Sequence, residues 1–216
     1  MRTISHVVEE IIQRSPFLAE AMAEGVGNNA QIARKILPDV EKRLYEKVSE
    51  AAIAMALHRM GKKFRRTPYS EKFLKQMNDI TVRSNLVEFV CPSSEDFSAL
   101  LETISKSARR RKDTFVHFSR GLHESLLVLD DESARAMSAA LSRHKVTRRN
   151  DNVSAIMLRL PEESLDVPGL YYPVLKALAN EGISFVEIVS IRTELSILFK
   201  DADIDRAFSV LKRITS

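Results

Sequence analysis

The chain has 216 residues, a net charge of +4 and 44% hydrophobic residues, enough to bury a core in one large or two to three small domains. No apolar run reaches the roughly 18 residues of a membrane span, and Glu9 and Glu10 interrupt the apolar N-terminus, so neither a span nor a secretory signal is expected. The single cysteine, Cys91, excludes an internal disulfide, and a reducing cytoplasm is the simplest setting.

Residues 1–80 are predicted to form a helical domain. Apolar residues recur at helical spacing over Ile4–Ile12, and Ser15-Pro16 starts a second helix with proline in its first turn. The segment Gly25-Val26-Gly27-Asn28-Asn29 then breaks the pattern.

A short and a long helix are expected after this break. Asn29 is expected to cap a helix over Ala30–Leu37, and Pro38 to open a longer helix that ends near Met60. Short helices around a tight turn are typical of a helix-turn-helix module. In that interpretation, DNA contacts come from Gln31, Arg34, Lys35, Lys42, Arg43, Arg59, Lys62, Lys63, Arg65 and Arg66.

Charge supports two interpretations of this domain. Basic clusters at Lys62–Arg66, Arg109–Lys112 and Arg143–Arg149 can attract phosphate, although solvated loops and helix ends also explain each of them. The long helix carries acids that repel phosphate, namely Asp39, Glu41, Glu46 and Glu50. A helical bundle that dimerises, or packs on the rest of the chain, therefore stays open beside DNA binding.

Residues 81–150 are predicted to form a domain with the order strand, helix, strand, strand, helix. Alternating and continuous apolar runs indicate strands, and Ser94 and Asp130 stand where helices are expected to begin. The predicted elements are Leu86–Cys91, a helix from Glu95, Thr114–Ser119, Leu122–Leu129 and a helix through Leu141. Lys145–Asn150 is either the last strand of this domain or a linker.

Residues 151–216 repeat this element order. The predicted elements are Val153–Leu160, a helix from Leu170 to Ala179 stopped by Gly182, Ile183–Ile191, Glu194–Phe199 and a helix over Ile204–Ile214. The expected fold class is therefore α+β, with a helix-turn-helix-like domain followed by two ferredoxin-like βαββαβ domains.

The second copy resembles ACT domains, the small amino-acid-sensing modules, and most closely those of aspartokinases. The segments that carry the resemblance are Asp166–Leu170, Val174–Ser184, Glu187–Ser190, Arg192–Ile197 and Asp203–Ala207. The first copy matches in topology alone, so a tandem ACT pair is inferred from element order. No part of the chain resembles a kinase catalytic domain.

The resemblance implies a ligand site with two sides. A glycine in the strand–helix turn lets the backbone approach a ligand or a partner subunit, the next helix offers N–H groups to a carboxylate, and Glu187 suits a cationic amino group. One side is Asp166, Val167, Pro168, Gly169 and Leu170. The facing side is Ser184, Phe185, Val186 and Glu187.

Motifs for catalysis are missing from the sequence. It has no glycine-rich phosphate loop, no HExxH, no cysteine pair and no G-x-S-x-G, and no cofactor or metal is expected. We therefore expect a non-enzymatic homodimer that senses a small molecule, an amino acid, and regulates transcription through DNA. The alternative is a regulatory or scaffolding subunit that dimerises through its ACT domains and controls a partner enzyme.

Overall fold

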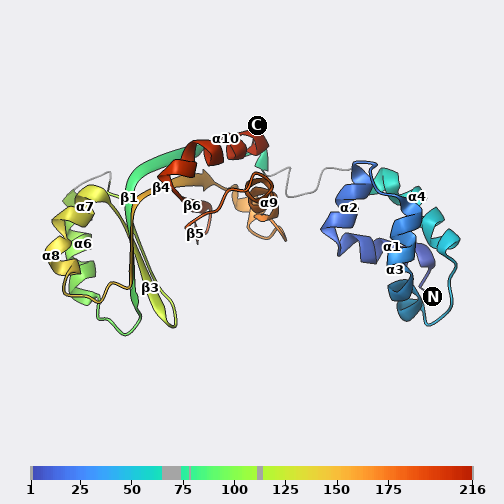
Figure 1. Ribbon diagram of the computed structural model, residues 1–216, viewed down its shortest axis with the longest axis horizontal. Coiled ribbons are helices and arrows are strands. Elements are labelled where there is room, and N and C mark those ends of the chain that lie inside the picture. The colour runs from blue at the N-terminus through green and yellow to red at the C-terminus, as the bar shows by residue number, and fades with distance from the viewer. Residues whose placement is uncertain (1, 65–73, 78, 111–113, 216) are drawn as a thin grey trace. The chain divides into compact units, whose positions relative to one another are not determined.

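The computed structural model describes residues 2–64, 74–77, 79–110 and 114–215, and the chain divides into two compact units, Met1–Pro68 and Tyr69–Ser216 (Figure 1). Among the described residues, no helix has the length and apolar character needed to cross a membrane.

The first unit is helical, as the sequence predicts. Its helices are α1 (Ile4–Gln13), α2 (Pro16–Ala23), α3 (Asn29–Leu44) and α4 (Glu50–Phe64). They share one hydrophobic core, whose fully buried members include Val7, Val8, Ile12, Ala33, Val40, Ile53 and Leu57.

Helix α3 differs from the prediction because it continues through Pro38. The buried residues Ile32, Ile36 and Val40 form one stripe across the proline, and their burial offsets the backbone hydrogen bond that proline cannot donate. The N-cap is Asn28 rather than Asn29. Its side-chain oxygen accepts hydrogen bonds from the backbone N–H groups of residues 30 and 31, at 3.0 and 3.2 Å.

The predicted long helix over Pro38–Met60 is two helices. Tyr45 has φ 58°, a left-handed conformation that ends α3. Ser49 then caps α4, since its hydroxyl accepts a hydrogen bond from the backbone N–H of Ala52 at 3.2 Å. A helix-turn-helix arrangement stays a prediction for this unit.

The second unit is α+β, as expected. Its strands are β1 (Ile80–Pro92), β2 (Val116–Arg120), β3 (Glu124–Asp130), β4 (Arg148–Arg159), β5 (Glu187–Ile191) and β6 (Glu194–Lys200). They form one six-stranded sheet in the order β2-β3-β1-β4-β6-β5, and each neighbouring pair is antiparallel. The connecting helices are α6 (Ser98–Arg110), α7 (Asp131–Ala136), α8 (Ser138–Leu141), η1 (Glu162–Ser164), α9 (Tyr172–Asn180), η2 (Asp201–Asp203) and α10 (Ile204–Thr215).

The two predicted copies share β1 and β4. The second half of β1 pairs with β3, and Arg148–Asn150 of β4 pairs beside it as the fourth strand of the first lobe. The first half of β1, Ile80–Arg83, pairs with the second half of β4 and is the fourth strand of the second lobe. The predicted boundary between residues 150 and 151 lies inside β4, so the copies are two lobes of one sheet.

The two shared strands bend at equivalent asparagines. Asn85 and Asn152 have φ 58° and 59°, and the register of the β1–β4 pairing shifts between Arg83 and Glu88. A run of four buried residues follows each asparagine, Leu86–Phe89 in β1 and Val153–Ile156 in β4. The lobes are therefore related by a pseudo-symmetry in backbone conformation and burial.

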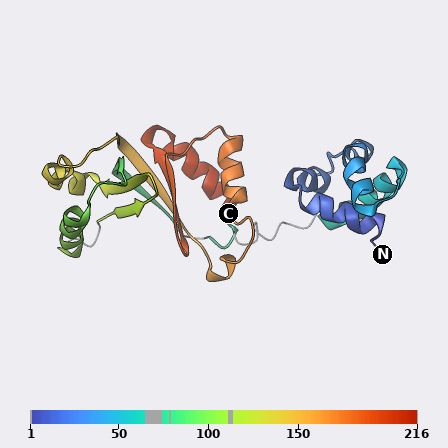
Figure 2. The same cartoon turned by 90° about the horizontal axis from the view of Figure 1, so that it is seen from below.

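Each lobe has helices on one face of the sheet. Helices α6, α7 and α8 lie at the end of the sheet with β2 and β3, and α9 and α10 lie at the end with β5 and β6 (Figures 1 and 2). We call the opposite sheet face the inner face. Its buried cluster is Leu86, Val128, Val153, Ala155 and Leu198.

Candidate functional site

The predicted turn Asp166–Leu170 joins η1 to α9. Gly169 has φ 74°, and a Cβ placed on it would meet no atom within 4 Å, so the backbone faces open space. Leu170 is buried and anchors the turn in the core of the second lobe, whereas Asp166 and Pro168 are exposed.

This turn lies beside the β5–β6 hairpin. The hydroxyls of Tyr171 and Ser190 are hydrogen-bonded at 2.6 Å, and Arg192 forms an ion pair with Glu162 at 3.1 Å. The backbone N–H of Leu160 donates to the carbonyl of Thr193 at 2.7 Å. The turn therefore belongs to the end of the lobe where β4 ends and β5 turns into β6.

The other predicted side, Ser184–Glu187, lies at the opposite end of α9. The backbone N–H of Ile183 donates to the carbonyl of Leu178 at 3.0 Å, and that of Val186 donates to Leu198 at 2.6 Å. The nine residues of α9 span about 13 Å, at 1.5 Å per residue. Within one chain, α9 therefore lies between the two predicted sides, and a ligand site that they share stays a prediction.

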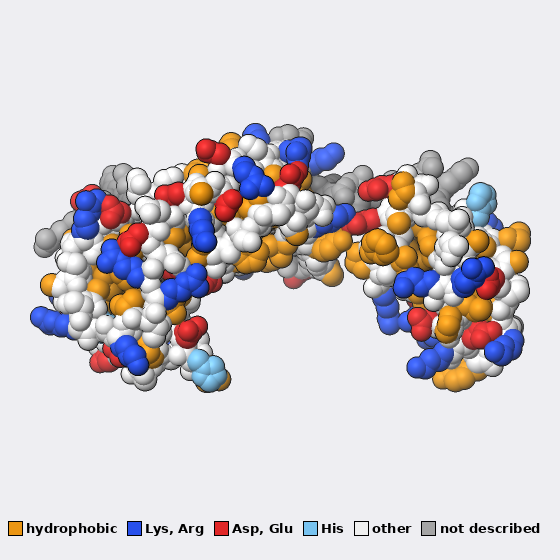
Figure 3. Space-filling model, in the orientation of Figure 1, with side chains coloured by type: hydrophobic (Ala, Val, Ile, Leu, Met, Phe, Trp, Pro, Cys, Tyr) orange, Lys and Arg blue, Asp and Glu red, His pale blue; other side chains and the backbone are white. Residues whose placement is uncertain are grey.

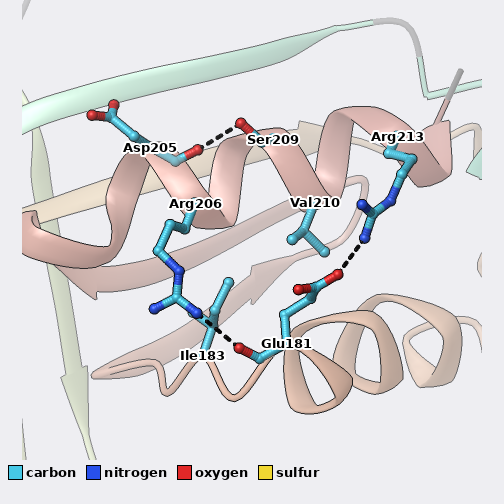
Figure 4. Close-up of a pocket in the computed structure, with 7 residues that line it drawn as sticks. All are labelled: Glu181, Ile183, Asp205, Arg206, Ser209, Val210 and Arg213. Carbon is cyan, nitrogen blue, oxygen red and sulfur yellow. Dashed lines mark hydrogen bonds and ion pairs between the residues drawn. The ribbon is translucent and has the colours of Figure 1, made fainter.

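A cavity of about 330 Å³ opens at this end of α9 (Figure 4). Residues of α10 and the segment after α9 line it, namely Glu181, Ile183, Asp205, Arg206, Ser209, Val210 and Arg213. Arg206 donates to the carbonyl oxygen of Glu181 at 2.9 Å, and Arg213 donates to its carboxylate at 2.6 Å. Because acids and arginines alternate in the lining, the cavity has no single charge preference.

Glu187 lies on the inner face. Ile188 packs on the helix side, and neighbouring strand residues point to opposite faces, so Glu187 and Val189 point to the inner side, where Val189 packs on the buried cluster. Burial, followed by the charge of Glu88, raises the pKa of Glu187, and Glu124 adds to the shift while Arg148 opposes it.

Glu88 is a site residue that the sequence interpretation missed. It is fully buried in β1, and one carboxylate oxygen accepts a hydrogen bond from the side-chain amide of Asn150. Its other oxygen, Oε1, is buried and has no partner among the described residues. The available signal was an acid inside the apolar run of residues 86–91, where burial of a charge is costly without a partner.

The inner face carries a third titratable group at the position equivalent to Glu187. His117 pairs in register with Val128 as Glu187 does with Leu198, and burial lowers the pKa of His117. Both side chains are half-buried, and burial favours the neutral form of each. No group of three or more metal-ligating side chains occurs in the described part of the chain.

Several predicted DNA contacts are engaged within the first unit. Arg34 pairs with Glu50 at 3.4 Å, Arg43 with Glu10 at 3.5 Å, and Arg59 donates to the hydroxyl of Ser5 at 3.3 Å. The predicted residues with exposed side chains elsewhere on α3 are Gln31, Lys35 and Lys42.

The side chains of the remaining predicted DNA contacts lie outside the described part of the structure. Lys62 and Lys63 belong to α4, with side chains outside the described ones, and Arg65 and Arg66 lie outside the described residues. On the face shown in Figure 3, basic side chains of the first unit are interspersed with acidic and hydrophobic ones. That face therefore presents no continuous basic surface.

Comparison with protein-family models finds no match, and comparison with curated proteins finds none either. Solved structures do match, and they define the class of the fold. Aspartate kinase from Clostridium acetobutylicum aligns with 65% of this chain at a TM-score of 0.53 and 12% identity, and this chain covers 35% of it. Aspartate kinase from Synechocystis aligns with 64% of this chain at a TM-score of 0.51 and 12% identity, and this chain covers 27% of that enzyme.

The chain thus spans about a third of the length of these aspartate kinases or less. A regulatory subunit of aspartate kinase from Thermus thermophilus aligns with 65% of this chain at a TM-score of 0.49 and 9% identity, over 99% of its own length. At these identities the similarity concerns the fold. The expected resemblance to the ACT region of aspartokinases is confirmed at that level.

Proposed function

We propose that this chain is a cytoplasmic, non-enzymatic regulatory protein that binds an amino acid through its second unit. The observation that carries the proposal is the fold of that unit, two ACT-like lobes in one sheet similar to aspartate kinases. The open turn at Gly169 supports it, because a ligand can approach the backbone there. Regulation then follows from a difference in ligand affinity between two arrangements of the protein.

The ligand site is built from two copies of the chain. In one copy, the turn Asp166–Leu170 and the segment Ser184–Glu187 lie at opposite ends of α9, a helix about 13 Å long. A twofold axis that sets two α9 helices antiparallel brings the turn of one copy beside the strand segment of the other. The turn and the segment, each of which has exposed residues, are then the two sides of one site.

Mixing two defective variants tests this arrangement. Gly169→Ala and Glu187→Ala each remove one side, so neither homodimer binds the amino acid that wild type binds. When equal amounts of the two variants exchange subunits, about half of the dimers contain one copy of each, and each such dimer has one intact site of two. A calorimetric titration of the mixture should therefore give about a quarter of the wild-type binding capacity. No recovered binding in the mixture, although wild type binds, would place both sides in one copy.

In this proposal the first unit transmits the effect of the ligand, and it does so by binding DNA and regulating transcription. A titration of labelled duplex DNA with the full chain checks it, with affinity that falls steeply as salt rises. No DNA binding at low salt excludes this output.

A protein partner is the second candidate, favoured by exposed apolar side chains in the first unit. Phe17, Val26, Tyr45 and Met55 are between 64% and 94% exposed. In this case the chain is a regulatory or scaffolding subunit that controls a partner enzyme. Recovery of an enzyme with the wild-type chain, lost with Phe17→Ser and Met55→Ser, supports it, and unchanged recovery contradicts it.

A further inference from the structure

A groove of about 410 Å³ lies in the first lobe, between α7–α8 and the strands β1 and β4. Its size is within the range of small-molecule pockets, roughly 300–1,000 Å³. Apolar residues and two serines line it together with Arg135, His144 and Arg149, and no acid is among the described residues that line it. In contrast, the cavity beside α10 contains Glu181 and Asp205. The groove of the first lobe therefore has a lining of one charge sign.

The floor of the groove is part of the hydrophobic core. Phe89 and Leu141 belong to the buried cluster of the first lobe, and Val146 packs against it. Because these side chains are fixed by the core, the floor is formed before any ligand arrives. An apolar body placed on it would lose its contact with water.

Arg149 is held at the rim of the groove. Its guanidinium lies 5.4 Å from the centre of the Phe89 ring, and the carboxylate of Asp151 accepts from its Nε and Nη2 at 3.0 and 2.8 Å. A guanidinium has five N–H donors, so donors remain for a second anion. Asp151 does not line the groove, and it orients the arginine without filling the space.

Arg135 and His144 also have an acidic partner each. Arg135 pairs with Asp131, and the Nδ1 atom of His144 is 3.2 Å from a carboxylate oxygen of Glu95. The ring of His144 stacks on Phe97 with 4.9 Å between centroids. Both acids lie outside the lining, so each one positions a donor beside the groove.

We propose that this groove binds a small molecule that consists of an oxyanion, a carboxylate or a phosphate, attached to an apolar body. The oxyanion lies between Arg135 and Arg149, and the body rests on Phe89, Leu141 and Val146. This second ligand site is independent of the turn at Gly169.

The test uses the full chain and four probes followed by calorimetry or ligand-observed NMR: phenyl phosphate, benzoate, benzyl alcohol and inorganic phosphate. We expect phenyl phosphate or benzoate to bind about tenfold more tightly than benzyl alcohol and than inorganic phosphate, since charge and apolar contact both contribute. Tighter binding of phenyl phosphate identifies the oxyanion as a phosphate, and tighter binding of benzoate identifies it as a carboxylate.

Arginine variants locate the site. Arg149→Gln and Arg135→Gln should each weaken binding about tenfold, since each removes a charged donor. Arg143→Gln is the matched control, because Arg143 is exposed in the same basic run and does not line the groove. Gly169→Ala should leave this binding unchanged, so failure of the amino-acid site and failure of this groove are distinguishable.

Four results would overturn the proposal. They are no binding of any probe, binding of benzyl alcohol equal to that of the tighter of phenyl phosphate and benzoate, binding of inorganic phosphate equal to that of the same tighter probe, and equal losses from Arg143→Gln and Arg149→Gln.

Discussion

Glu88 and Glu187 place two carboxylates on a sheet face whose other buried residues are apolar. Burial disfavours the ionised form of Glu187, and the neighbouring Glu88 carboxylate adds to that effect. Asn150 satisfies one oxygen of Glu88, and Arg148 partly compensates Glu187. The ionised form of Glu187 therefore lowers folding stability, and a proton or a cationic ligand group at this carboxylate offsets that loss.

The pH dependence of stability should reveal Glu187. Its folded pKa is raised above the ordinary value of 4.5, so its stabilising contribution is fully present below pH 4.5 and is lost as pH rises through the raised value. Glu187→Gln removes this loss. The variant should therefore gain urea resistance relative to wild type as pH rises from 4.5 towards neutrality.

The control for this titration is Glu163→Gln, because Glu163 is exposed in η1. Its difference from wild type should stay flat across the same pH range. A constant difference for Glu187→Gln as well would mean that burial and Glu88 do not perturb this carboxyl.

At the scale of elements, α3 contains a residue that disfavours an α-helix. Pro38 donates no backbone hydrogen bond and crowds the carbonyl four residues earlier, at Arg34. The side chain of Pro38 is exposed, and the core contacts of α3 come from its neighbours. Packing of Ile36 and Val40 thus holds a helix that local propensity alone would break.

Pro38→Ala should stabilise the first unit by about 1–3 kcal/mol, because alanine restores the donor and fits the helix. Hydrogen exchange at the amides of Ile36 and Val40 measures the change. Pro16→Ala is the matched control. Pro16 lies in the first turn of α2, where a backbone N–H has no partner within the helix, so this substitution should not increase stability. Loss of protection in Pro38→Ala would show that the proline itself shapes the core.

Patterns along the sequence predict the parts of the fold that local chemistry decides. The predicted strand Glu194–Phe199 and the stop at Gly182 correspond to β6 and a glycine with φ 65°, whereas the predicted strand Ile183–Ile191 forms only from Glu187 onward, as β5. The pairing of Ile80–Arg83 with the second lobe is a contact between segments about 75 residues apart, which no local pattern contains.

The candidate site shows the same limit. The open conformation of Gly169 follows from turn chemistry and is present. The expected facing of Asp166–Leu170 and Ser184–Glu187 stays a prediction, because the sequence pattern does not account for the length of α9 between them. Glu88 could be suspected from its apolar neighbours, but its electrostatic effect on Glu187 acts between β1 and β5, which β4 and β6 separate in the strand order, and no local pattern predicts it.

At the scale of the whole second unit, β1 and β4 belong to both lobes. Neither lobe can lose its sheet without removing a strand from the other. The unit is therefore expected to unfold cooperatively, and a change at one lobe can reach the other through two continuous strands. This connection is the physical basis on which a ligand in one lobe can influence the other.

Leu178→Ala in α9 tests this coupling. Leu178 is fully buried, so its truncation should cost about 2–5 kcal/mol. Hydrogen exchange should quicken in β3 of the first lobe as well as in β6. Leu122→Ala, at an 87% exposed position, should change neither. Faster exchange confined to β5 and β6 would mean that the lobes unfold separately.

The most direct measurement of the central claim is a thermal-shift screen of the twenty amino acids with the full chain. A ligand that binds the folded state alone adds about 2.7 kcal/mol of stability at a concentration 100 times its Kd. We predict that at least one amino acid raises the Tm of wild type and of Gly182→Ala, whose backbone strain matches that of Gly169→Ala. Gly169→Ala and Glu187→Ala should lose the shift. An unchanged Tm with all twenty amino acids, or an equal shift in Gly169→Ala, would contradict amino-acid sensing at this turn.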